Sequence, residues 1–199
     1  MSIPIEKAEV VNPLCDGIVT NWDVLSSIYD YALRTDLGVD PHEHPLLAVE
    51  PPDNTNHARE MLTELAFENL TVPAFFVAKS SVLASFASGK PSALVVDCGA
   101  SRTVVSAVHE GYCLRKSIVT SSIAGRFITE EFLKELRGKE IPVRPRFMFK
   151  RKEVHPGEFV TKECKNDNIT ASYTSYATRE ICDDIKLNMC SVSQKKLYL

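Results

Sequence analysis

Hydrophobic residues recur along this chain with two spacings, each typical of one kind of secondary structure. After Asn21, a residue type that caps helices, they return every three or four positions, which indicates a helix with one buried face. Short apolar runs bounded by turn-forming residues indicate buried strands instead. We expect helices to begin at Asn21, at Thr55 or Asn56, at Ser80 and at Ile128, and strands to cover residues 44–50, 72–78, 93–96, 103–108 and 112–119. The side chains expected in the core from the first two helices are Trp22, Leu25, Ile28, Tyr29, Leu33, Met61, Leu62, Leu65 and Phe67.

Composition restricts the class of protein further. The mixture of strands and helices is typical of an α/β protein, and 199 residues are enough for one large domain or two small ones. A hydrophobic content of 44% and a net charge of −3 indicate a globular protein without a general attraction to nucleic acid. No apolar run approaches the ~20 residues that a membrane-spanning helix needs. The six cysteines show no CxxC pair, which favours reduced thiols in an intracellular protein.

The segment from Ser92 to Gly111 carries the most specific chemical pattern. It consists of an apolar strand, a turn of small residues from Asp97 to Ser101, and a second strand rich in β-branched residues. Unpaired backbone N–H groups in such a turn can hold phosphate oxygens, and Asp97 could hold a cation through water. The alternative interpretation is an ordinary hairpin in which Asp and Gly serve only the turn.

The run from Asp97 to Val105, DCGASRTVV, resembles the second phosphate hairpin of actin and its relatives, which reads DSGDGVTHT. Further blocks resemble that family in the same order over residues 10–192, so the chain is identified as a member of the actin and actin-related family. These blocks are GIVTNWD (17–23), EHPLL (43–47), REMLT (59–63), VPAFFV (72–77), VLASFASG (82–89), EGY (110–112), AGR (124–126), TREI (178–181) and DIK (184–186).

The resemblance implies a partial actin fold of the type shared with Hsp70 and hexokinase, with mixed sheets flanked by helices. Residues 1–89 would belong to the first lobe, with a hinge helix at 80–88. Residues 90–137 would form the phosphate-hairpin meander of the second lobe, and residues 138–199 an insertion plus part of its outer subdomain. Because family members are about twice as long, we expect the chain to be a central portion that lacks the first phosphate hairpin and the C-terminal half.

The family binds ATP with Mg²⁺ or Ca²⁺, so the resemblance assigns nucleotide contacts to matching positions. They are Asp97 (also holding the metal through water), Gly99, Ala100, Ser101, Thr103, Gly125 and Lys186. Other positions depart from the family: Ser80 replaces a glutamine and Val104 a histidine, the two residues that assist the attacking water. Ala100 replaces the second Asp, and Leu187 removes an acid from the adenine site. We therefore expect weak or absent ATP binding and no hydrolysis.

Within the family, residues 143–153 resemble the nuclear actin-related subunits of chromatin-remodelling complexes. That branch implies a non-catalytic nuclear scaffold, with nuclear actin and chromatin as further partners. A helix of the motor subunit would lie in a groove lined by Phe86, Ala87, Gly89 and Tyr112. The alternative is a cytoplasmic, ATP-binding, actin-like protein that forms or caps filaments.

Two weaker patterns remain. Residues 138–170 contain several prolines and glycines and are expected to be an insertion or mobile loop. Its basic cluster, Lys150 to Lys152, is either a solvated charge run or a contact for DNA or an acidic partner. His42 and His44 could form a metal pair, although a structural turn is the interpretation that the family favours.

Overall fold

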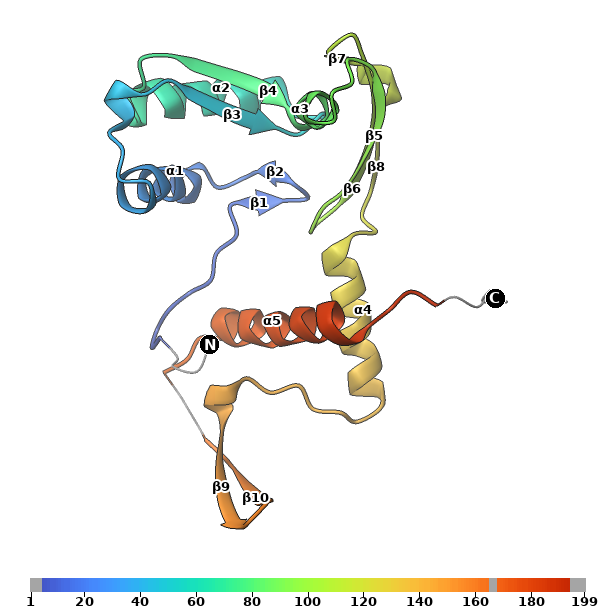
Figure 1. Ribbon diagram of the computed structural model, residues 1–199. Helices are drawn as coiled ribbons and strands as arrows, with labels where there is room; N and C mark the ends of the chain where they lie inside the picture. The colour runs from blue at the N-terminus through green and yellow to red at the C-terminus, as the bar shows by residue number, and fades with distance from the viewer. Residues whose placement is uncertain (1–4, 165–167, 194–199) are drawn as a thin grey trace. The chain divides into compact units, whose positions relative to one another are not determined.

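A computed structural model describes residues 5–164 and 168–193 of the chain (Figure 1). Residues 12–125 form one compact unit, and the segments 1–11 and 126–199 form another. We describe each unit by itself. Within the described ranges, no helix combines the length and the apolar character that crossing a membrane requires.

The first part of the larger unit packs helices against a pair of parallel strands. The hairpin β1 (Leu14–Cys15) and β2 (Ile18–Val19) leads into α1 (Trp22–Asp30), which continues as the π-helical turn η1 (Tyr31–Asp36). The short turn η2 (Pro41–Glu43) precedes β3 (Leu46–Glu50), which pairs in parallel with β4 (Phe75–Lys79). Between these strands lie α2 (Asn56–Glu64) and η3 (Leu65–Asn69).

The predicted starts of α1 and α2 are confirmed by their caps. The Asn21 side chain accepts a hydrogen bond from the N–H of Val24, and the Thr55 hydroxyl accepts one from the N–H of Ala58. Each satisfies a backbone donor that the first turn of a helix otherwise leaves without a partner.

The core of this part is a cluster of Leu65, Ala66, Leu70 and Val72, against which α1 packs one face. The predicted face is confirmed at Trp22, Leu25, Tyr29 and Leu33. It is wrong at Ile28, whose side chain is 48% exposed, because each residue turns the helix by about 100° and Ile28 lies at the edge of the buried stripe. For the second predicted helix, the expectation of a core position is wrong at Phe67, which is 44% exposed and packs edge-on against Phe75.

The second part of the larger unit is a four-stranded antiparallel sheet with one helix packed on it. Helix α3 (Ser80–Ala87) is followed by β5 (Ala93–Cys98) and β6 (Thr103–His109), close to the predicted bounds. Strand β6 is central: it pairs with β5 on one side and with β7 (Tyr112–Cys113) and β8 (Val119–Ser121) on the other. The predicted lobe boundary between Ser88 and Lys90 stays a prediction.

The strand predicted over residues 112–119 is wrong, because a 3-10 turn, η4 (Arg115–Ser117), interrupts it. The N–H of Leu114 donates to the carbonyl of Ala107, after which the chain leaves the ladder. The hydroxyl of Ser117 then accepts the hydrogen bond from the N–H of Ala107 at 2.9 Å. A side chain thus satisfies the backbone group that a continuous strand would have satisfied.

In the described residues of the smaller unit, the main elements are two α-helices and a β-hairpin. Helix α4 (Gly125–Gly138) is longer than predicted, and α5 (Ala171–Met189) is the longest helix in the described part of the chain. Phe147, Tyr173 and Ala177 form a small core with Ala8 and Ile169 packed against it.

Of the two expectations for residues 138–170, an insertion or a mobile loop, the loop alternative is wrong over residues 149–163, and the insertion stays a prediction. After the short turn η5 (Arg146–Met148), strands β9 (Phe149–His155) and β10 (Glu158–Glu163) pair in an antiparallel hairpin. The turn at Gly157, with φ +85°, connects them. Backbone hydrogen bonds next to a tight turn can form a hairpin with few apolar residues. The hydrophobic pattern therefore did not predict the β9–β10 hairpin.

Candidate nucleotide hairpin and partner surface

The turn between β5 and β6 is closed by its own backbone. Asp97 lies opposite Val104 and Cys98 opposite Thr103, and the N–H of Gly99 donates to the carbonyl of Arg102 at 3.0 Å. The expectation that the whole turn leaves its N–H groups unpaired is therefore wrong at Gly99. Within the described residues, the N–H groups of Ala100 and Ser101 make no intrachain hydrogen bond. These two are the donors that the turn can offer to an anion.

The two faces of the β5–β6 pair differ in burial. Val104, Ser106 and Val108 are buried on one face, and the register places Asp97 on this face beside Val104. The carboxylate of Asp97 is nevertheless exposed, because it lies at the end of the strand. The exposed carboxylate of Asp97 can attract a cation. The side chain opposite it, Val104, is aliphatic and cannot accept a proton.

Gly125, at the start of α4, lies directly against the turn. Its N–H donates to the carbonyl of Gly99 at 3.1 Å, and a Cβ at Gly125 would lie 3.7 Å from the Cα of Ala100. The hydroxyl of Thr103 donates to the carbonyl of Ile123 at 2.7 Å. The structure thus brings four predicted contacts together, at Gly99, Ala100, Thr103 and Gly125, with Ser101 in the same turn.

Lys186 belongs to the other compact unit and is engaged there in a polar cluster. Its ammonium donates to the hydroxyl of Thr129 at 2.6 Å and to the carboxylate of Asp183 at 2.7 Å. Burial alone would raise the pKa of Asp183, but hydrogen bonds from Lys186 and Thr129, with the charges of Lys186 and Arg179, lower it. The cluster joins α4 to α5, which gives Lys186 a structural role, and its contact with a nucleotide stays a prediction.

Sequence reasoning missed the contact that fixes the turn to the first part of the same unit. The guanidinium of Arg102 forms two hydrogen bonds with the carboxylate of Asp53, at 2.7 and 2.8 Å. Gly17 lies against this pair, since a Cβ there would lie 2.5 Å from Nε of Arg102. Arg102 is the only charged residue between Asp97 and His109, which is the one signal in the sequence that pointed to it.

The loop that carries Asp53 is itself held by a buried carboxylate, that of Glu50. Its side chain accepts hydrogen bonds from Arg59 and from Asn54, and Lys79 lies 3.6 Å away. Burial alone would raise the pKa of Glu50, but the hydrogen bonds from Arg59 and Asn54 and the charges of Arg59 and Lys79 lower it. The Glu50 cluster therefore connects β3, β4 and α2 behind the loop that carries Asp53.

The predicted partner groove is an exposed aromatic patch in this structure. The side chain of Phe86 is 53% exposed and that of Tyr112 is 77% exposed, and Ala87 and Gly89 are exposed as well. The ring of Phe86 lies over Gly111, where a Cβ would come within 2.8 Å of it. Gly111 also has φ +79°, so two separate constraints favour glycine beneath the ring.

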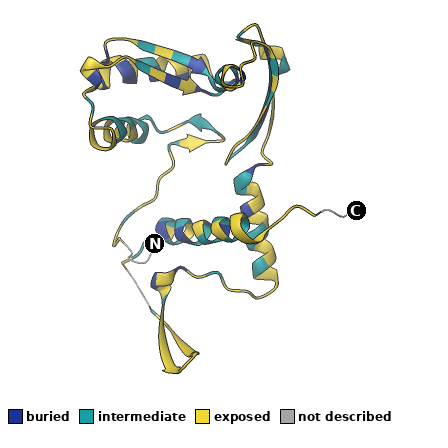
Figure 2. Cartoon of the chain, in the orientation of Figure 1, coloured by how far each residue is buried: buried dark blue, intermediate teal, exposed yellow. Residues whose placement is uncertain are grey.

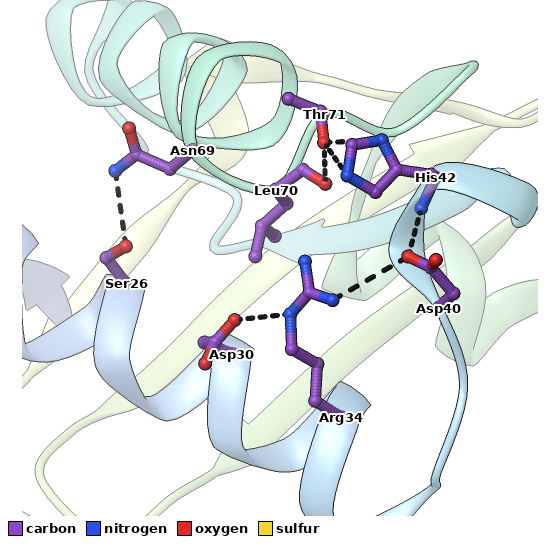
Figure 3. Close-up of polar contacts among 8 residues, drawn as sticks. All are labelled: Ser26, Asp30, Arg34, Asp40, His42, Asn69, Leu70 and Thr71. Atoms are coloured by element: carbon purple, nitrogen blue, oxygen red, sulfur yellow. Dashed lines mark hydrogen bonds and ion pairs between the residues drawn. The ribbon is translucent and has the colours of Figure 1, made fainter.

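The two histidines of the candidate metal pair each make a contact within the protein, and Figure 3 shows those of His42 with Thr71 and Asp40. A ring nitrogen of His42 lies 2.9 Å from the hydroxyl of Thr71, and Nδ1 of His44 lies 2.9 Å from the carbonyl of Asp40. The carboxylate of Asp40 accepts the N–H of His42 and lies 3.7 Å from Arg34. These contacts give both imidazoles a structural role in the turn before β3.

Comparison with known proteins gives a consistent result. The family model for actin matches residues 1–198. Actin-related protein 4 of Oryza sativa subsp. japonica is 48% identical over 187 residues, and that of Arabidopsis thaliana is 46% identical over 192 residues. Actin-related protein 4 of Schizosaccharomyces pombe is 35% identical over 186 residues. These matches cover 94%, 96% and 93% of this chain but only 42%, 44% and 43% of the relatives. The chain thus spans less than half the length of the curated relatives it matches.

Proposed function

This chain belongs to the actin family, and we propose that it is part of a nuclear, non-catalytic actin-related subunit of a chromatin-remodelling or histone-acetyltransferase assembly. In this role it binds a helix of the motor subunit, with nuclear actin and chromatin as further partners. The strand and helix pattern of a partial actin fold supports the family. The relatives named Actin-related protein 4 and the nuclear-type residues 143–153 support the branch.

The observation that carries the proposal is a pair of exposed aromatic side chains, Phe86 at the end of α3 and Tyr112 on β7. Phe86 and Tyr112 present large apolar surfaces at positions that match the partner groove of the family. Aromatic side chains in a groove commonly anchor an amphipathic helix, each worth ~2 kcal/mol or more. Because Gly111 has no side chain, the ring of Phe86 can lie against it at the surface. The partner helix would therefore meet an aromatic ring that is already in place.

The nucleotide site supports weak binding without turnover. The N–H groups of Ala100 and Ser101 and the carboxylate of Asp97 fit a phosphate group and its Mg²⁺ or Ca²⁺, which would neutralise phosphate charge when bound. At the two positions that assist the attacking water, Val104 supplies a buried aliphatic side chain and Ser80 a short hydroxyl. Loss of such a group costs ~10²–10⁴-fold in rate.

The test is affinity purification of the tagged protein from nuclear extract, with the motor subunit as the readout. We expect the Phe86→Ala/Tyr112→Ala variant to lose at least about tenfold of the captured motor, given the usual weight of aromatic anchors. Tyr31→Ala, which removes a 58% exposed aromatic side chain on η1, is the matched control and should retain the motor. Full capture by the folded double variant would place the partner surface elsewhere. In a parallel purification from cytoplasmic extract, recovery with filaments and without the motor subunit would support the cytoskeletal alternative.

A further inference from the structure

The β9–β10 hairpin sorts its side chains by face. In an antiparallel pair, residues directly opposite each other point to the same side of the sheet, and neighbours along a strand alternate. Lys150 lies opposite Lys162 and Lys152 lies opposite Val160. These four side chains therefore share one side, which we call the lysine face.

The opposite face is occupied by contacts of its own. Arg151 stacks on the ring of Phe159 at 4.3 Å, and Arg146 lies 5.1 Å from the ring centre of Phe149. On the same side, Glu163 pairs with Arg144 at 2.8 Å. Because Arg151 contacts Phe159 across the strands, the stacking also supports the assignment of faces from the register. Phe149, Phe159 and Glu163 on this face are thus already partnered.

The lysine face has no such partners. In the described part of the chain, none of its three lysines forms an ion pair, and Val160 is 59% exposed between them. Figure 2 shows nearly the whole hairpin as exposed. Like charges directly opposite each other, as at Lys150 and Lys162, destabilise a pair of strands, and an isolated two-stranded hairpin is marginal in water. Both features are relieved when an anionic partner binds.

We propose that the lysine face binds an extended acidic protein segment, which adds as a third strand along β9. Strand addition uses the unpaired backbone groups of an edge strand. In a neighbouring strand, side chains at alternate positions point to one face about 6.8 Å apart, the same period that separates Lys150 from Lys152. Glutamate or aspartate at every second position would therefore face both lysines.

An acidic peptide fits this face better than nucleic acid does. The hairpin from Phe149 to Glu163 carries four Lys or Arg and three Glu, and the chain as a whole has a net charge of −3. A phosphate polyanion would meet repulsion from these acids, whereas a short peptide can place its carboxylates at the lysines alone. The exposed Val160 also offers an apolar contact that a phosphate backbone does not use. This inference is independent of the proposed function, because it concerns another element and another ligand.

The experiment measures fluorescence anisotropy of a labelled eight-residue peptide, alternating Glu and Val, with the whole 199-residue chain. We expect Lys150→Gln/Lys152→Gln to weaken binding roughly 5- to 30-fold, the scale of two exposed charge pairs. Lys150→Arg/Lys152→Arg should bind as the unmodified protein does. Lys116→Gln/Lys139→Gln removes two exposed lysines outside the hairpin and should change binding less than about twofold. Unchanged circular dichroism of each variant shows that the chain still folds.

Two further probes distinguish the partner and the mode of binding. A peptide with N-methyl groups on its hydrogen-bonding amides should bind more weakly, because strand addition needs those N–H groups. A 20-base-pair DNA duplex should bind more weakly than the acidic peptide at the same salt concentration. Equal peptide binding by Lys150→Gln/Lys152→Gln, no effect of N-methylation, or tighter binding of the duplex would each overturn the proposal.

Discussion

Arg102 and Asp53 lie 49 positions apart in the sequence and form a bidentate ion pair, with side chains only 12% and 26% exposed. The pair joins the turn of the candidate nucleotide hairpin to the β3–α2 loop. Planar guanidinium and carboxylate groups match in two parallel hydrogen bonds, which lysine cannot reproduce. The ion pair between Arg102 and Asp53 therefore fixes the position of the β5–β6 turn relative to the β3–α2 loop.

A double-mutant cycle tests the strength of this pair. We expect Arg102→Ala and Asp53→Ala to show a coupling energy of about 1–2 kcal/mol in urea unfolding, above that of an exposed pair because both groups are mostly buried. Arg102→Lys should restore less than half of it. A coupling energy below about 0.3 kcal/mol would mean that the two groups contribute independently.

The buried carboxylate of Glu50 should matter more for stability than any surface pair. Glu50 is 1% exposed and Arg59 is 50% exposed, and Arg59→Ala leaves the buried carboxylate with only Asn54 and Lys79, so it should lower the free energy of unfolding by about 1–3 kcal/mol. Arg34→Ala is the matched control: Arg34 is 42% exposed and pairs with Asp30, which is 57% exposed. Its loss should cost less than about 1 kcal/mol. Similar losses in both variants would contradict the role of Glu50.

The same carboxylates predict how stability depends on pH. The folded protein holds the pKa of Glu50 below its ordinary 4.5 and that of Asp183 below its ordinary 3.8. A lowered pKa stabilises the folded state fully above the ordinary value, and this contribution is lost as the pH falls through the lower, folded value. The free energy of unfolding should therefore decline below about pH 4.5. In Glu50→Gln, urea titrations between pH 3 and 7 should show a shallower decline; an identical slope would exclude Glu50 as a source.

Gly111 should be intolerant of any side chain. Gly111→Ala places a Cβ 2.8 Å from the ring of Phe86 and strains a residue with φ +79°. We expect a loss of about 1–2 kcal/mol in unfolding free energy, together with weaker capture of the motor subunit. Gly38→Ala is the control for the backbone term, because Gly38 has φ +64°, no atom within 4 Å of its Cβ position, and no part in the predicted groove. Equal effects of both changes on capture would show that the ring of Phe86 is not displaced.

Nucleotide binding by the 199 residues should be weak. The hairpin supplies few phosphate donors, so we expect calorimetry with ATP and Mg²⁺ to give a dissociation constant weaker than about 1 μM, or roughly −8 kcal/mol. No release of inorganic phosphate above background is expected, since Val104 and Ser80 cannot orient water. A submicromolar constant or measurable turnover would refute this expectation.

The sequence by itself determined the local elements and the family. Side chains within four residues of each other decide caps and amphipathic faces, so Asn21, Thr55 and the face from Trp22 to Leu33 could be read directly. The apolar run before Asp97 and the β-branched run after the turn likewise predicted β5 and β6, and the ordered motifs identified the actin family.

Contacts between residues far apart in the sequence were decided by the tertiary structure alone. The pairing of Arg102 with Asp53, the ring of Phe86 over Gly111, and the separation of lysines from acids on the β9–β10 hairpin depend on register and packing between segments. The interruption at Ser117 had the same origin, because a side chain replaced a backbone partner. Such contacts leave no periodic pattern in the chain, since their free energy comes from geometry that exists only after folding.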